Sequence, residues 1–130
     1  MAKQNLIPIN SGVYVITNTA NGKIYVGSSR HVRQRIRHHR RNLELGVHSS
    51  KRMIDDFLLF GWEVFEHEIV EPIHEPGVDL MAAEQRWIEK LRPYDPIIGY
   101  NLHPDAGGPR GYARPPETRE RMRQAASDGS

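Results

Sequence analysis

Apolar and polar residues alternate along two short segments near the start of the chain, residues 12–18 and 23–28. Alternation with a period of two is typical of β-strands that have one buried face. Asn21 and Gly22 stand between the two segments, and Asn-Gly between alternating runs is a strong short-range signal for a β-hairpin. We therefore predict an antiparallel hairpin at the start of the domain.

A helical period follows the hairpin and predicts two helices in succession. The first is expected to run from an N-cap at Ser28 or Ser29 to about residue 45, where Gly46 stops it. Its inner stripe is Val32, Ile36, His39 and Leu43. The second is expected over residues 51–60, with Ser49 or Ser50 as its cap and Gly61 as its end. Its apolar positions are Met53, Ile54, Phe57 and Leu58.

The second half of the chain predicts one more strand and one more helix. Residues 62–70 alternate with period two, which indicates the strand. Residues 78–91 have a helical stripe, and prolines 93 and 96 break the pattern after it. Residues 97–102 are expected to close the domain as a loop packed over the core.

The composition changes after His103, which predicts three regions in the 130-residue chain: a folded domain over residues 1–103, a linker over residues 104–114 and a tail over residues 115–130. Residues 104–111 are rich in Gly and Pro, and the tail begins with two prolines and continues with basic residues that suit a short helix. The tail has too few apolar residues for a core of its own, and we expect it to be a partial, truncated unit.

Charge is segregated along the chain, although the formal net charge is only +2. Residues 30–52 carry eight Arg or Lys against one acid, whereas residues 63–89 carry eight acids and one Arg. A dense basic block is typical of a surface that binds phosphate, but it is equally the ordinary composition of a solvated helix face. The chain has no cysteine, no long apolar run and no apolar stretch at its start. We therefore expect an intracellular protein with no membrane partner.

Candidate chemistry lies in the hairpin and in the last helix. Tyr14 and Tyr25 are on opposite arms of the hairpin, which can bring the two phenols together. Glu84 lies on the apolar stripe of the helix over residues 78–91, where a carboxylate is costly to bury without a cation, a metal or a hydrogen-bond donor. Each residue also has an ordinary interpretation, the tyrosines as strand aromatics and Glu84 as an ion-pair partner of Arg35.

Several short motifs occur in a fixed order: Gly12-Val13-Tyr14, Tyr25-Val26-Gly27, Arg35, His48-Ser49-Ser50, Glu84 and Gly99-Tyr100-Asn101. Together they resemble the catalytic domain of the GIY-YIG nuclease family, in its phage and intron-encoded homing endonuclease branch, with Val where the family name has Ile. The resemblance implies an α+β fold in which helices flank a small three-stranded antiparallel sheet, followed here by the linker and the short basic helical tail. It also implies metal-dependent hydrolysis of phosphodiester bonds in DNA.

The resemblance implies a role for each residue of the set. Glu84 would bind one divalent ion, Mg²⁺ or Mn²⁺. Arg35 would stabilise charge on the phosphate. Tyr14 would act as general base or proton relay, while Tyr25 orients water or phosphate and His48 relays a proton from the tyrosine. Asn101 would brace the site. Gly12 and Gly27 would be structural, because Gly allows close approach of the backbone.

We expect double-stranded DNA to be the partner, bound by a monomer or a transient dimer. The basic residues expected to contact DNA are Arg30, Arg33, Arg37, Arg40, Arg41, Lys51 and Arg52, together with Arg119, Arg121 and Arg123 in the tail. The tail resembles a modular DNA-binding motif that follows GIY-YIG domains in homing enzymes, and its alternative is a disordered end. Two alternatives for the whole chain are a repair or restriction nuclease of the same family and a DNA-binding module without catalysis.

Overall fold

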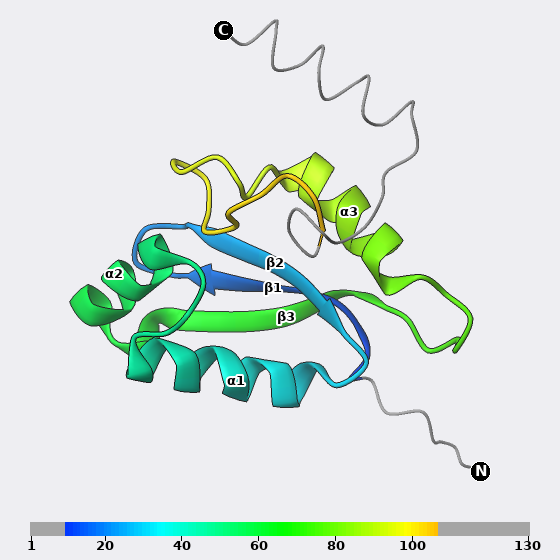
Figure 1. The fold of residues 1–130 in the computed structure, drawn as a ribbon, viewed down its shortest axis with the longest axis horizontal. Helices are drawn as coiled ribbons and strands as arrows, with labels where there is room; N and C mark the ends of the chain where they lie inside the picture. Colours follow the sequence, from blue (N-terminus) through cyan, green and yellow to red (C-terminus); the bar gives the residue numbers. More distant parts are fainter. Residues whose placement is uncertain (1–9, 107–130) are drawn as a thin grey trace, which may run out of the picture.

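The computed structural model describes residues 10–106, which form an α+β domain with a three-stranded sheet between helices (Figure 1). This fold class is the expected one. The elements in chain order are β1 (Gly12–Asn18), β2 (Ile24–Ser29), α1 (Val32–Leu45), α2 (Lys51–Phe60), the short 3₁₀ helix η2 (Trp62–Val64), β3 (Phe65–Pro72) and α3 (Leu80–Leu91).

The sheet is antiparallel, with β1 in the centre and the order β2-β1-β3. The hairpin places Tyr14 of β1 opposite Gly27 of β2. On the other side, β1 meets β3 with a bulge between Val13 and Tyr14. Gly12 starts β1 with φ +148°, and a Cβ atom there would overlap the carbonyl oxygen of Glu71 on β3. Gly12 is therefore required by the backbone, as expected.

Helices cover both faces of the sheet (Figure 1). On the α1 face the core contains Tyr14, Ile16, Val32, Ile36, Leu43, Met53, Phe65 and Tyr100. On the α3 face it contains Val13, Val15, Val26, Ile73, Ala83, Ile88 and Ala106. Alternate residues of β1 thus enter two separate cores, which the period of two along a strand requires.

The predicted stripe of α1 is confirmed, since its buried residues are Val32, Ile36, His39 and Leu43. The predicted cap of α1 is wrong. The hydroxyl of Ser29 accepts from the amide of His31, and α1 begins only at Val32. Asn10 satisfies the first turn instead, because its backbone oxygen accepts from the amide of Val32 and its side chain accepts from that of Arg33. At the other end, Gly46 is left-handed as predicted.

The second helix, α2, spans the predicted residues, whereas β3 and α3 start a few residues later than predicted. Ser50 caps α2, its hydroxyl accepting from the amide of Met53, and Gly61 ends the helix. Leu58, one of the apolar positions of this helix, is exposed, with an exposed fraction of 75%. The third strand begins at Phe65 rather than at residue 62, because η2 precedes it. Asp79 caps α3 with its carboxylate.

The first residues of the predicted linker are packed against α3. The side chain of Gln85 donates to the carbonyl oxygen of Pro104 and accepts from the amide of Ala106, and Ala106 is fully buried. The ordered domain thus extends at least to Ala106. The rest of the linker and the tail over residues 115–130 lie outside the described residues.

Candidate active site

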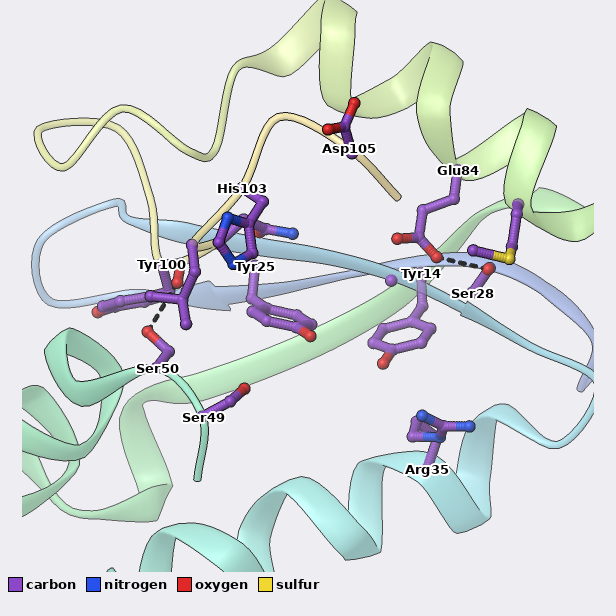
Figure 2. Close-up of a pocket in the computed structure, with 14 residues that line it drawn as sticks. Tyr14, Tyr25, Ser28, Arg35, Ser49, Ser50, Glu84, Tyr100, His103 and Asp105 are labelled. Carbon is purple, nitrogen blue, oxygen red and sulfur yellow. Dashed lines mark hydrogen bonds between the residues drawn. The ribbon is translucent and has the colours of Figure 1, made fainter. Parts of the chain in front are cut away.

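A pocket of about 480 Å³ opens at the edge of β2, between α1 and α3 (Figure 2). Its walls come from β1, β2, α1, α3, the loop before α2 and the segment that follows α3. The residues that line it are Tyr14, Tyr25, Gly27, Ser28, Arg35, Ser49, Ser50, Met81, Glu84, Tyr100, Asn101, Leu102, His103 and Asp105. Of the six expected catalytic residues, five line this pocket, and His48 lines a neighbouring hollow of about 210 Å³ that shares Tyr25, Arg35 and Ser49 with it.

Gly27 makes room for the ring of Tyr14. A Cβ atom at residue 27 would lie 2.5 Å from the hydroxyl oxygen of Tyr14 and 2.6 Å from the ring carbon that carries it. A real Cβ atom essentially never has non-bonded contacts this short, so the ring occupies the space that a side chain at residue 27 would need. The Tyr-Gly pairing across the hairpin therefore has a steric cause, since only glycine leaves this space for the ring.

Two buried histidines continue from Tyr14 in a chain of hydrogen bonds. The hydroxyl of Tyr14 lies 2.7 Å from Nε2 of His39, and Nδ1 of His39 lies 2.7 Å from Nε2 of His48. The backbone amide of Ser50 donates to Nδ1 of His48 over 3.0 Å. Tyr25 covers this chain, because its ring packs edge-on against both imidazoles.

Burial shifts the pKa of these groups toward their neutral forms. Burial, followed by the neighbouring Tyr25, raises the pKa of Tyr14 far above its ordinary value, while the Arg35 cation opposes that change. Burial raises the pKa of Tyr25 to about 12. It lowers the pKa of His39 to about 3 and also lowers the pKa of His48. All four side chains are therefore uncharged at neutral pH in the protein alone.

Arg35 and Glu84 approach the Tyr14 hydroxyl region from opposite sides of the sheet (Figure 2). Arg35 is an exposed residue of α1, whereas Glu84 is a half-buried residue of α3. The Ser28 hydroxyl donates to the Glu84 carboxylate over 2.6 Å. The pocket thus has a cation on one wall and an anion on the other, and α1 and α3 bring them together across the edge of β2.

The donor set suits a hard cation that keeps water in its shell. Between residues 10 and 106, no three His, Asp or Glu side chains converge in a way that could hold a metal ion by themselves. Glu84 nevertheless presents carboxylate oxygen at an open pocket. Mg²⁺ is commonly bound in proteins through one or two carboxylates, with water and substrate phosphate completing its shell. The residues present therefore fit such an ion.

Asn101 closes the free edge of β2. Its side-chain oxygen accepts from the amide of Val26 and its side-chain nitrogen donates to the carbonyl of Val26, both over 2.9 Å. Asn101 is itself buried. It thus imitates one residue of a neighbouring strand and holds β2 beside the pocket.

His39 and Ser28 were missed as site residues by sequence reasoning. His39 was assigned only to the apolar stripe of α1, yet it is the residue that touches the Tyr14 hydroxyl. The signal was available, since a histidine on a buried helical stripe needs hydrogen-bond partners. Ser28 follows the Tyr-Val-Gly motif directly, but nothing in its local pattern pointed to Glu84. His103 and Asp105 were also missed and line the outer wall of the pocket.

The cations expected to bind DNA fall into three groups. Arg33, Arg37, Arg41 and Lys51 are exposed on α1 and α2. Arg40 is exposed but pairs with Glu44 and lies over the ring of Trp62. Arg30 and Arg52 donate to backbone carbonyls, those of residues 75, 76 and 78 and of residues 99 and 101 respectively. These two hold loops in place, and Arg119, Arg121 and Arg123 lie outside the described residues.

None of the helices within residues 10–106 has the length and apolar character needed to cross a membrane.

Comparison with known proteins gives a consistent result. Residues 10–101 match the family model of the GIY-YIG catalytic domain. Over 94 residues the chain is 38% identical to intron-associated endonuclease 1 of Enterobacteria phage T4, an alignment that covers 72% of this chain and 37% of that protein. The chain therefore matches little more than a third of the length of this relative.

Two solved structures resemble the domain. One is a mutant of the catalytic domain of the intron endonuclease I-TevI, with a TM-score of 0.66 and 38% identity over 74% of this chain and 95% of that one. The other is the catalytic domain of the homing endonuclease I-TevI, with a TM-score of 0.63 and 38% identity over 72% of this chain and 98% of that one.

Proposed function

The chain belongs to the GIY-YIG family of catalytic domains, and on that premise we propose that it is a metal-dependent DNA endonuclease of the homing type. The observation that carries this proposal is the convergence of Tyr14, Arg35 and Glu84 on one pocket. These residues come from three elements, β1, α1 and α3. Packing of the helices on the sheet does not by itself require a phenol, a guanidinium and a carboxylate at one edge of the sheet.

Hydrolysis of a phosphodiester requires a nucleophile, charge stabilisation at phosphorus and help for the departing oxygen. Arg35 is exposed in the pocket wall, so its planar guanidinium can bind two phosphate oxygens and stabilise the charge that develops on them. A divalent cation held by Glu84 supplies further charge neutralisation at the phosphate and at the departing oxygen when it is bound.

Tyr14 acts on the attacking water as general base. Because burial raises its pKa, the phenol has to lose its proton before it can accept one, and nearby positive charge favours that loss. The Arg35 cation supplies part of this charge in the protein alone. Tyr25 forms the wall beside it and orients water or phosphate, and Asn101 keeps β2 and therefore Tyr25 in place.

The exposed residues of α1 and α2 provide the path for DNA toward the pocket. Of the expected DNA-binding cations within residues 10–106, Arg33, Arg37, Arg41 and Lys51 remain for phosphate once Arg30 and Arg52 are assigned to loops and Arg40 to its pair with Glu44. Replacing Arg37 by Ala should reduce the salt dependence of duplex binding by the equivalent of about one phosphate, a slope change of about 0.9 in log K against log salt. Lys90→Ala on α3 is the matched control, and an equal change in both variants would contradict this path.

Plasmid nicking tests the proposal directly. The parent chain is expected to nick supercoiled DNA with Mg²⁺ and to stop when EDTA is added. Glu84→Ala should abolish nicking while duplex binding, measured by fluorescence anisotropy, stays equal or becomes slightly tighter, since a negative charge near phosphate is removed. Glu68→Ala, at an exposed position of β3, is the matched carboxylate control and should nick like the parent.

Two outcomes would contradict the proposal. Nicking by Glu84→Ala at the rate of the parent would rule out its role with the cation. Tight duplex binding without any nicking, also after fusion to a DNA-binding domain that supplies targeting, would identify the chain as a DNA-binding module.

A further inference from the structure

The hydrogen-bond chain beneath Tyr14 has one fixed end, the backbone amide of Ser50. This amide lies 3.0 Å from Nδ1 of His48, and because an amide N–H can only donate, Nδ1 of His48 has to accept. Ser50 cannot move away easily. It is fully buried, its hydroxyl donates to the carbonyl of Tyr100 over 2.7 Å, and it caps α2.

The donor at Ser50 determines which nitrogen donates in each of the two imidazole rings. A neutral His48 whose Nδ1 accepts carries its hydrogen on Nε2, so it donates to Nδ1 of His39 over 2.7 Å. His39 then carries its own hydrogen on Nε2 and donates to the Tyr14 oxygen, also over 2.7 Å. The tautomer of each ring follows from the bond that its other nitrogen makes.

Other protonation states leave two donors facing each other. A hydrogen on Nδ1 of His48 would point at the Ser50 amide. A hydrogen on Nδ1 of His39 would point at the Nε2 hydrogen of His48. Neutral rings also agree with the environment, since burial lowers the pKa of both His39 and His48. One arrangement therefore satisfies every donor and acceptor from Ser50 to Tyr14.

We propose that His48 and His39 are positioning residues, which fix the Tyr14 oxygen as a hydrogen-bond acceptor and direct its own proton into the pocket. Neither histidine can take the phenol proton in this arrangement, so the expected relay from Tyr14 to His48 does not operate. The proton leaves Tyr14 on the pocket side, to solvent. The phenolate, held by Nε2–H of His39, then accepts one proton from the attacking water as the water oxygen bonds to phosphorus. The bond between phosphorus and the departing oxygen breaks in the same step, and that oxygen takes up a proton from solvent. This step rests on the proposed nuclease function.

Nitrogen-15 NMR of the imidazole rings tests the arrangement without any need for activity. Spectra of the labelled full chain at pH 7.5 should show His39 and His48 as neutral rings with the hydrogen on Nε2. In His48→Gln the side-chain amide still donates to His39, so the His39 tautomer should stay. In His48→Leu the donor is lost, and a fraction of His39 should carry its hydrogen on Nδ1.

Nicking by the same variants gives the second readout. His48→Leu should nick about 10- to 100-fold more slowly than the parent, the usual cost of losing a group that orients an active-site imidazole, and His48→Gln should recover part of that loss. Thermal unfolding shows whether each variant is folded, and if His48→Leu does not fold, the spectrum of the parent decides the question alone.

The outcomes separate this inference from the proposed function. A hydrogen on Nδ1 of either ring in the parent, or an imidazolium, would overturn the positioning role, and so would an unchanged His39 tautomer in a folded His48→Leu. If the chain shows the predicted tautomers but never nicks DNA, the tautomers still support the proposed hydrogen-bond direction. Only the nuclease function would then be contradicted.

Discussion

The two faces of the sheet are buried by different kinds of side chain. On the α3 face the hydrophobic core residues are small or aliphatic, and their contribution comes from apolar area removed from water: Val13, Val15, Val26, Ile73, Ala83, Ile88 and Ala106. The polar side chain of Gln85 on α3 is buried as well, but it bonds to residues 104 and 106 outside the pocket chemistry. On the α1 face, Tyr14, His39 and His48 are buried among apolar side chains, and each has to be satisfied by a hydrogen bond.

Because the two faces differ, alternate residues of β1 have different roles. Val13 and Val15 of β1 hold α3 against the sheet, whereas Tyr14 between them belongs to the polar chain of the opposite face. Glu84 is carried by α3, the helix that packs on the aliphatic face, and reaches the pocket at the sheet edge. The aliphatic face therefore fixes geometry, and the α1 face carries Tyr14 and the two histidines of the proposed mechanism. Changes on the two faces should then affect different measurements.

Tyr14→Phe should produce the largest effect, and mainly on rate. It removes the base but keeps the ring, so nicking should fall by about 10²- to 10⁴-fold. Unfolding free energy should fall by only about 1–3 kcal/mol, because Nε2–H of His39 loses its acceptor in a buried place. Single-turnover nicking and urea denaturation measure the two effects. A variant that nicks as fast as the parent would remove Tyr14 from the mechanism.

Ile88→Ala on the α3 face should reduce stability and leave the nicking rate unchanged. Ile88 is 1% exposed, and truncation of such a side chain costs about 2–5 kcal/mol of unfolding free energy. The nicking rate per folded molecule should stay that of the parent. Ile97→Ala is the matched control, since Ile97 is 84% exposed and should change stability by less than about 0.5 kcal/mol. A large loss of nicking rate in fully folded Ile88→Ala would contradict the claim that the α3 face contributes only to stability.

Gly27→Ala should affect both measurements, because residue 27 lies directly against Tyr14. The added methyl group overlaps the phenol, and overpacking of this kind costs about 1–3 kcal/mol of unfolding free energy. The displaced ring should also lower the nicking rate. Gly77→Ala is the control, because a Cβ atom there meets nothing within 4 Å. Equal stability of Gly27→Ala and the parent in urea would mean that the Tyr14 ring can move aside without cost.

The free energy of unfolding should fall gradually in acid because of His39, a buried residue of the α1 face. The pKa of His39 is lowered to about 3 by burial and, to a lesser extent, by the charges of His48, Arg35 and His38, whereas an unfolded histidine has a pKa of about 6.5. Between these values the unfolded chain binds more protons, so stability falls as pH falls from about 6.5 toward 3. The slope from this group approaches about 1.4 kcal/mol per pH unit, the value for one proton.

Urea denaturation at several pH values measures that slope. His39→Phe should flatten it, whereas His67→Phe at an exposed position of β3 should leave it as in the parent. An unchanged slope in His39→Phe would assign the acid sensitivity to other groups.

The amino-acid sequence by itself determined the elements and most of the site residues. The hairpin follows from Asn21 and Gly22 between alternating runs, and the ends of the first two helices follow from Gly46, Ser50 and Gly61. These signals are local, because turn and cap chemistry involves residues a few positions apart. The order of the family motifs then indicated which polar residues to bring together.

Only the tertiary structure decided which partner each buried polar group takes. Asn101 pairs with Val26 across 75 positions, Tyr14 with His39 across 25, and the first turn of α1 with Asn10 across 23. A pattern of apolar positions tells which face of an element is buried but not what lies opposite. The partners become defined only when the helices pack on the sheet, and the direction of the chain from Ser50 to Tyr14 is a consequence of that packing.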